Sequence, residues 1–97
     1  MIRRIYDLVG EQAIIATEVG QHQMWTALYY PFKEPRTLIT SGGLGTMGYG
    51  LGASMGAQLG RPDKRVFNIA GYGSFRMNLN ELSTAKYYNI PIIEVVM

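Results

Sequence analysis

Apolar residues in the first third of the chain alternate between helical and strand-like spacing. Positions 2, 5, 6 and 9 recur at intervals of three or four residues, which predicts a short helix over 2–9. The continuous apolar run 13–17 is typical of a strand covered on both faces. Residues 23–30 pair Met24 with Leu28 and Trp25 with Tyr29, and two prolines follow. This pattern predicts a second helix.

The rest of the chain continues the alternation. We expect strands at 37–40, 66–70 and 92–96, a glycine-rich turn at 41–48 leading into a helix that extends to residue 60, and a helix after residue 78. Asn78 and Glu81 have the spacing of a capping box for this last helix, and Leu79, Leu82 and Ala85 are expected to form its core face. Four strands alternating with helices predict an α/β fold, a doubly wound parallel sheet with helices on both faces.

Glycine recurs at every fourth position of the helix that follows the turn, at Gly48, Gly52, Gly56 and Gly60. Each of them costs up to about 1 kcal/mol relative to alanine inside a helix. We therefore expect another part of the protein to lie close against this stripe.

The composition of the chain excludes several classes of protein. A chain of 97 residues forms one small domain, and without cysteine it has neither disulfides nor thiolate metal ligands. Its basic residues are scattered and the net charge is +2, which argues against nucleic-acid binding. Residues 44–60 carry no charge but are too rich in glycine for a membrane helix, and no export signal is visible. These features predict a cytoplasmic protein that neither crosses a membrane nor binds nucleic acid.

The segment Gly43-x-Gly45-x-x-Gly48 matches the fingerprint of dinucleotide-binding proteins. That fingerprint also requires an acidic residue at the end of the next strand, where Tyr72 follows the strand and Asp63 precedes it. A nicotinamide site and a simple packing motif both remain alternatives at this point.

Several other residues are expected to have structural roles when each is considered alone. His22, the only histidine, is expected to be a cap or a surface residue. Met24, Trp25, Met47 and Met55 are expected to lie in the core.

Three longer segments occur in order and carry more information together than separately. They are residues 19–25 (VGQHQMW), 41–48 (SGGLGTMG) and 71–75 (GYGSF). In this respect the chain closely resembles acetohydroxyacid (acetolactate) synthases, from about Ile5 to Val96. Other thiamine-diphosphate enzymes, such as pyruvate oxidases and decarboxylases, remain an alternative that the Gln-His-Gln-Met-Trp stretch disfavours.

The resemblance implies a thiamine-diphosphate site at the carboxyl ends of the strands. The diphosphate would contact Gly20, Gln21 and His22, and it would be cradled with its magnesium by Gly71, Gly73 and Ser74. Gly45 and Met47 would approach the aminopyrimidine. In the family the cofactor decarboxylates pyruvate and the product condenses with a second 2-ketoacid, a transferase reaction of branched-chain amino acid biosynthesis.

The chain departs from the family pattern at the metal site. Tyr72 stands where the family has a metal-binding aspartate, and a phenol is a poor ligand for Mg²⁺. The family's metal-binding asparagine falls just past Met97, and the glutamate that activates the aminopyrimidine belongs to a separate N-terminal domain. Gly52 replaces a usual proline. We therefore expect weakened magnesium binding.

Two hypotheses follow for residues 1–97 as a partial thiamine-diphosphate-binding domain. The first is a fragment of an acetolactate synthase that is inactive alone, contains no catalytic residue, and acts on 2-ketoacids only in a homo-oligomer or with the missing N-terminal domain. The second is a non-catalytic scaffold or dimerisation domain that has lost its metal site. In either case the last strand leaves a sheet edge that favours self-association.

Overall fold

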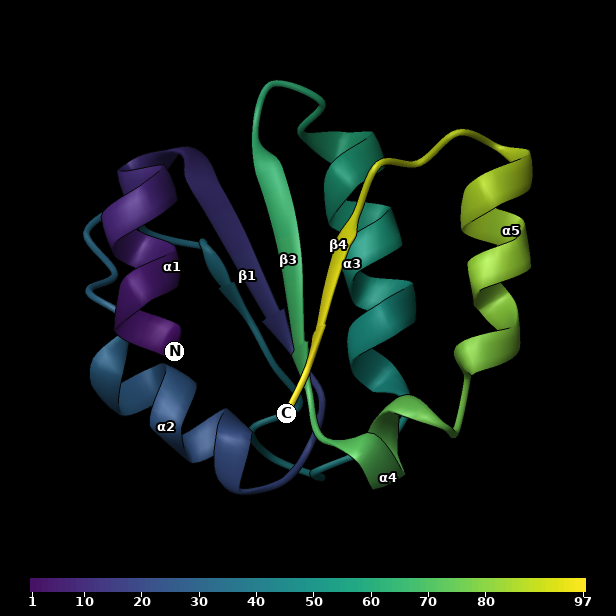
Figure 1. Ribbon diagram of the computed structural model, residues 1–97, viewed down its shortest axis with the longest axis horizontal. Helices are drawn as coiled ribbons and strands as arrows, with labels where there is room; N and C mark the ends of the chain where they lie inside the picture. Colours follow the sequence, from purple (N-terminus) through teal and green to yellow (C-terminus); the bar gives the residue numbers. More distant parts are fainter.

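The computed structural model describes all residues, 1–97, and contains one parallel sheet with helices on both sides (Figure 1). The strands are β1 (Ala13–Thr17), β2 (Leu38–Ile39), β3 (Arg65–Ala70) and β4 (Ile93–Val96), in the order β2-β1-β3-β4. The helices are α1 (Ile2–Val9), α2 (Gln21–Tyr29), α3 (Tyr49–Gly60), α4 (Tyr72–Phe75) and α5 (Leu82–Tyr87), with 3-10 turns η1 (Gly10–Gln12) and η2 (Leu79–Glu81). The predicted α/β fold with a doubly wound parallel sheet is confirmed.

The direction of each crossover decides which face of the sheet a helix covers. The connection from β1 to β2 moves one way across the sheet, and the connections to β3 and β4 move the other way. With right-handed crossovers this places α2 on one face and α3 and α5 on the other. Figure 1 shows α1 beside α2 on the first face.

The core lies on the two central strands. Every residue of β1 is buried, as are all residues of β3 after the first. On the face covered by α1 and α2, the main cluster comprises Ile2, Ala13, Ile15, Tyr30, Phe67 and Ile69. None of the helices combines the length and apolar composition needed to cross a lipid bilayer.

The helix α2 packs its polar face on the sheet, whereas its apolar pattern predicts that the face with Met24 and Trp25 is buried. Its buried residues are His22 and Thr26, and the Thr26 hydroxyl donates a hydrogen bond to the His22 carbonyl at 2.7 Å. Met24 and Trp25 are 58% and 41% exposed, so the prediction that they lie in the core is wrong. These polar side chains face the sheet, and the start of α1 only partly covers the bulky face of α2, beside Trp25 and Tyr29. Of the other methionines expected inside, Met55 is half-buried and Met47 is 43% exposed.

The glycine stripe of α3 also differs from its prediction. A Cβ atom added at Gly52, Gly56 or Gly60 would meet nothing within 4 Å, so no element of this chain lies against most of that stripe. The face toward the sheet instead carries Gly50, Leu51, Ser54 and Gln58. The close approach occurs at Gly50, where a Cβ would lie 2.8 Å from the backbone of Thr17 and Glu18.

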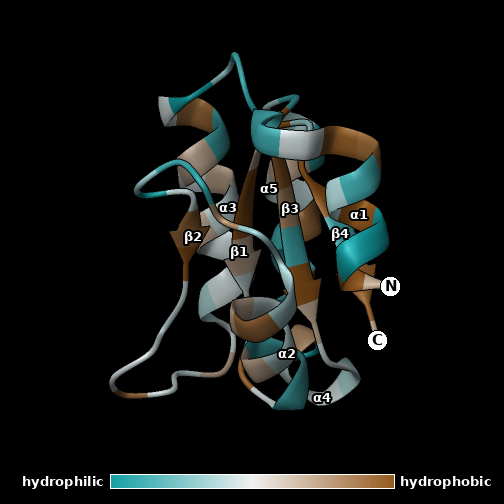
Figure 2. Cartoon of the chain, turned by 90° about the vertical axis from the view of Figure 1, so that its left-hand side faces the viewer, coloured by the Kyte–Doolittle hydropathy of each residue, from teal (hydrophilic) through white to brown (hydrophobic).

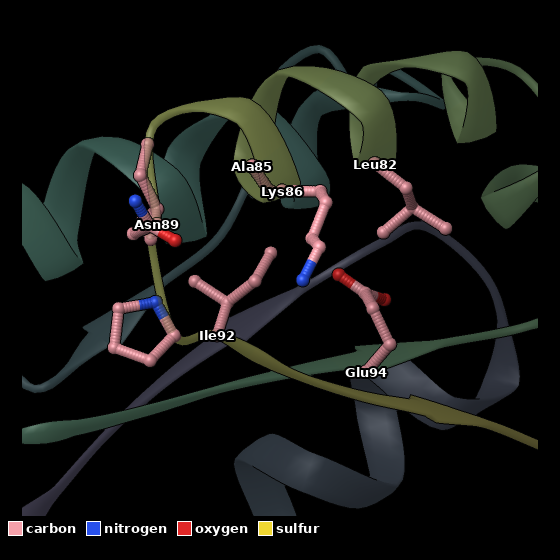
Figure 3. Close-up of a pocket in the computed structure, with 8 residues that line it drawn as sticks. Leu82, Ala85, Lys86, Asn89, Ile92 and Glu94 are labelled. Carbon is pink, nitrogen blue, oxygen red and sulfur yellow. The ribbon is translucent and has the colours of Figure 1, made fainter.

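The helix α5 stands away from the sheet. The predicted capping box does not form, because the Asn78 amide donates instead to the Gly48 carbonyl at 2.8 Å and the first turn is the 3-10 turn η2. Of the expected core face, only Ala85 is buried, while Leu79 and Leu82 are 41% and 38% exposed. A pocket of about 450 Å³ separates α5 from β4, and Lys86 and Glu94 point toward each other across it (Figure 3).

The Glu94 carboxylate predicts how stability depends on pH. Burial raises its pKa from 4.5 to about 7, the Asn68 amide opposes this through hydrogen bonds of 3.1 and 2.9 Å, and the Glu18 charge reinforces it. Between these two values the folded state holds a proton that the unfolded state has released, so stability falls as pH rises from about 4.5 to about 7. The full difference corresponds to about 3 kcal/mol, and partial exposure reduces the expected loss to about 1–2 kcal/mol.

Urea denaturation at several pH values checks this prediction, with Glu94→Gln as the control. His22 contributes the opposite slope, because burial lowers its pKa and its neutral form is favoured in the fold. The difference in unfolding free energy between the original chain and Glu94→Gln therefore reports the contribution of Glu94 alone. We expect the substitution to gain stability relative to the original chain as pH rises through this window, and a constant difference would contradict the assignment.

Candidate functional site

Three loops meet at the carboxyl end of the sheet, which is where parallel sheets bind ligands. They are the residues after β1 (18–20), the glycine-rich loop after β2 (40–48) and the turn that begins α4 (71–74). Figure 2 shows α2 and α4 together at this end of the molecule. All eight residues that the resemblance assigns to the cofactor lie on these loops or in the first turn of α2 or α4.

His22 joins two of the loops. The residue is 5% exposed, and its Nε2 accepts a hydrogen bond from the Gly71 backbone N–H at 3.2 Å. A Cβ at Gly20 would lie 2.8 Å from the ring and one at Gly71 would lie 2.9 Å from it, so both glycines make room for the imidazole. The expectation of a cap or surface histidine is therefore wrong.

The protonation state of His22 agrees with its role as an acceptor. Burial lowers the pKa of the ring, while the Glu18 backbone and the Glu18 charge oppose that shift. The imidazole is thus neutral at pH 7, and its Nε2 lone pair is available to the Gly71 N–H. In this state His22 holds the start of α2 against the start of α4.

Glu18 was not predicted to have a role, yet it organises the start of α3. Its carboxylate is fully buried and accepts hydrogen bonds from the backbone N–H groups of Gly48, at 2.7 Å, and Leu51, at 3.0 Å. A negative charge at the positive end of a helix is stabilising. The start of α3 is therefore already occupied by an anion of the protein itself, whereas the start of α2 has no side-chain cap.

The glycine-rich loop lies beside the turn at α4. Gly45 has a left-handed backbone with φ of 62°, and its N–H donates to the Ser41 carbonyl at 3.2 Å. The Met47 methyl group would be 4.0 Å from a Cβ at Gly73, so Met47 is within reach of that turn. Gln23 belongs to the 19–25 segment but was assigned no role, and it ties α2 to this loop by donating to the Thr40 hydroxyl at 2.8 Å.

The remaining residues that the resemblance assigns to the cofactor differ in how accessible they are to a ligand. Gln21 is exposed at the first position of α2, and Gly73 has open space around it apart from the Met47 methyl group. Ser74 is 2% exposed, and its hydroxyl donates to the Gly71 carbonyl at 3.1 Å, which stabilises the turn. None of the surface pockets is lined by the assigned residues. The site is thus an open face with free backbone donors.

The side chains present do not fit a magnesium ion. No group of three or more His, Cys, Asp or Glu side chains converges anywhere in the chain. Tyr72, at the position expected to hold a carboxylate, is 65% exposed and accepts a hydrogen bond from Arg76 Nη1 at 2.8 Å. Mg²⁺ requires anionic oxygen ligands in a tight octahedron, and these residues do not supply them. The glycines and backbone N–H groups, by contrast, suit a diphosphate.

Comparison with known proteins supports the resemblance found in the three segments. Residues 18–97 match the family described as thiamine pyrophosphate enzyme, C-terminal TPP binding domain. Acetolactate synthase 2, chloroplastic, of Nicotiana tabacum is 54% identical over 91 residues, which is 94% of this chain and 14% of that protein. The acetolactate synthase large subunit of Haemophilus influenzae is 47% identical over 97 residues, or 100% of this chain and 17% of that protein. The chain spans less than a fifth of the length of these relatives.

Proposed function

Because this chain belongs to the thiamine pyrophosphate enzymes, through their C-terminal TPP-binding domain, we propose that it forms the diphosphate-binding part of an acetolactate synthase. The complete enzyme would decarboxylate pyruvate and condense the product with a second 2-ketoacid. When bound, the cofactor supplies the nucleophilic carbon and the electron sink for that chemistry. The residues of this chain would bind and orient it, and none of them is assigned a catalytic role. The family match removes the support for a nicotinamide site.

The observation that carries this proposal is the pair of helix starts that His22 joins. The uncapped start of α2 offers the backbone N–H groups of Gln21 and His22, and the Gly71–Ser74 turn lies against it through the Gly71 to Nε2 hydrogen bond. Backbone donors at a helix start attract phosphate oxygens. Glu18 closes the equivalent place on α3, so the free donors gather between β1 and β3.

The aminopyrimidine end of the cofactor would lie toward the glycine-rich loop. Met47 is half exposed there and reaches toward Gly73, which gives an apolar contact beside the proposed diphosphate position. Gly45 keeps the loop open because its left-handed backbone disfavours a side chain. On this account the cofactor lies across an open face, and a second domain or a second copy of the chain would complete the site.

A chemical-shift titration locates the ligand. With thiamine diphosphate added to the ¹⁵N-labelled chain in magnesium buffer, the amides of residues 20–22 and 71–74 should shift progressively. Residues 61–64, at the opposite end of the sheet, should not shift. Thiamine without phosphates is the matched ligand control and should leave the 71–74 amides nearly unmoved. Shifts confined to 61–64, or none at all, would contradict the proposal.

The second candidate function is a non-catalytic scaffold that associates with other chains. It is favoured by the exposed apolar face of α2, formed by Met24, Trp25, Leu28 and Tyr29. Surfaces of this kind mark interfaces or aggregation sites. Sedimentation velocity separates the candidates when it is combined with the titration above, because a scaffold would associate without responding to thiamine diphosphate.

A further inference from the structure

We propose that this chain holds a diphosphate without a divalent cation, the Arg76 guanidinium supplying the positive charge and Tyr72 holding that guanidinium in place. The proposal rests on the proposed function for the position of the diphosphate. It goes beyond that function because it assigns a different chemistry to the end of the site where a metal is expected.

The structure provides no carboxylate for a metal at this end of the site. Both Glu18 oxygens accept backbone N–H groups at the start of α3. Glu81 accepts a hydrogen bond from the Thr84 hydroxyl at 2.7 Å within its own turn. The Tyr72 hydroxyl is already an acceptor for Arg76, and a neutral phenol competes poorly with water for Mg²⁺. Another source of positive charge is therefore needed to offset a diphosphate.

Arg76 provides a positive charge next to the turn that begins α4. It follows directly after α4, four residues from Tyr72, and its Nη1 donates to the Tyr72 hydroxyl at 2.8 Å. The guanidinium carbon also lies 5.4 Å from the centre of the Tyr72 ring, within the range of a cation–π contact. Arg76 forms no ion pair with any carboxylate of the chain. Its charge is thus uncompensated but held by an aromatic neighbour.

The geometry of arginine suits a phosphate. A guanidinium has five N–H donors, and the contact with Tyr72 uses one of them. The others form a planar fork that pairs with two phosphate oxygens, and the charge persists at every physiological pH. On this proposal Tyr72 has two effects: it removes the carboxylate that would hold a metal, and it contacts the arginine whose charge replaces that of the metal.

Isothermal titration calorimetry with inorganic pyrophosphate and with thiamine diphosphate tests this proposal. Each ligand is titrated into the chain once with EDTA and once with saturating magnesium. We expect thiamine diphosphate to bind with EDTA within about threefold of its affinity with magnesium. We expect Arg76→Gln to weaken both ligands by at least about tenfold with EDTA, and Tyr72→Phe, which keeps the ring and loses the hydroxyl, to weaken them by about two- to fivefold.

The control for overall charge is Arg65→Gln, at the exposed first position of β3 and the opposite end of the sheet. It should change neither affinity by more than about twofold, since screening limits interactions between distant exposed charges. Circular dichroism confirms that each variant is folded. Equal weakening by Arg65→Gln and Arg76→Gln would overturn the proposal, as would wild-type affinity in Arg76→Gln. Binding only with magnesium would overturn it while leaving the proposed function intact, and no binding in either buffer would overturn both.

Discussion

Replacing Gly50 with alanine should destabilise the protein by about 3 kcal/mol or more, the upper range for adding volume to a packed interior. The new Cβ would collide with Asn68 Oδ1 and would lie 2.8 Å from the backbone of both Thr17 and Glu18. These neighbours are buried and belong to β3 and the end of β1, so they cannot move without disturbing the sheet. A domain of this length is stabilised by only about 5–15 kcal/mol in total. The variant should therefore be poorly folded.

Gly52→Ala is the matched control, because it makes the same substitution two residues along the same helix. Nothing lies within 4 Å of the added Cβ. Alanine has the higher helix propensity, so this variant should gain about 0.5–1 kcal/mol. Urea denaturation followed by circular dichroism measures both variants. Equal stabilities for the two variants would show that α3 does not pack against β1 at Gly50.

Removing the Glu18 carboxylate should have the second largest effect. In Glu18→Ala the N–H groups of Gly48 and Leu51 lose their acceptor in a buried position. Hydrogen bonds to a charged group contribute about 1.5–3 kcal/mol each, and an unsatisfied buried donor adds its desolvation cost. Allowing for water that enters the space left by the side chain, we expect a loss of about 3 kcal/mol in the free energy of unfolding.

Glu18→Gln separates the charge from the shape of the side chain. Glutamine can accept from one of the two N–H groups, but its amide nitrogen faces the other, so we expect an intermediate loss of about 1–2 kcal/mol. The same denaturation experiment measures both substitutions. If Glu18→Ala were as stable as the original chain, the carboxylate would not be the cap of α3.

The strands could be predicted from the sequence because buried parallel strands leave a simple signal. The apolar run 13–17 coincides with β1, and the predictions at 66–70 and 92–96 lie within one residue of β3 and β4 at each end. The strand at 37–40 is shorter than expected, with only Leu38–Ile39 paired to β1. The parallel sheet then followed from the alternation of strands and helices, but the order β2-β1-β3-β4 was not predicted.

The orientation of the helices could not be predicted in the same way. Apolar spacing shows that a helix has an apolar face, but it does not show whether another element covers that face. In α2 the sheet takes His22 and Thr26 and leaves Trp25 exposed. In α3 the repeating glycines predicted the wrong contact face. The helix packs on the sheet at Gly50, next to a strand that ends more than thirty residues earlier in the chain.

The loops of the candidate site were predicted from three sequence segments, but the contacts between them were not. The His22 ring fits only because Gly20 and Gly71, 51 residues apart in the chain, both lie against it. The role of Glu18 could not be predicted. An acidic residue after a strand looks the same in the sequence whether its side chain is exposed or caps a helix that begins 30 residues later. Contacts between distant segments become visible only once the fold is assembled.

The most direct test is calorimetric titration of this chain with thiamine diphosphate and, in parallel, with thiamine. We expect thiamine diphosphate to bind with a Kd of about 100 μM or tighter, equivalent to about 5.5 kcal/mol. We expect thiamine to bind at least about tenfold more weakly, because backbone donors at a helix start attract phosphate oxygens, which thiamine lacks. Equal affinities for the two ligands, or no heat from either, would contradict the claim that the ends of β1 and β3 form a diphosphate site.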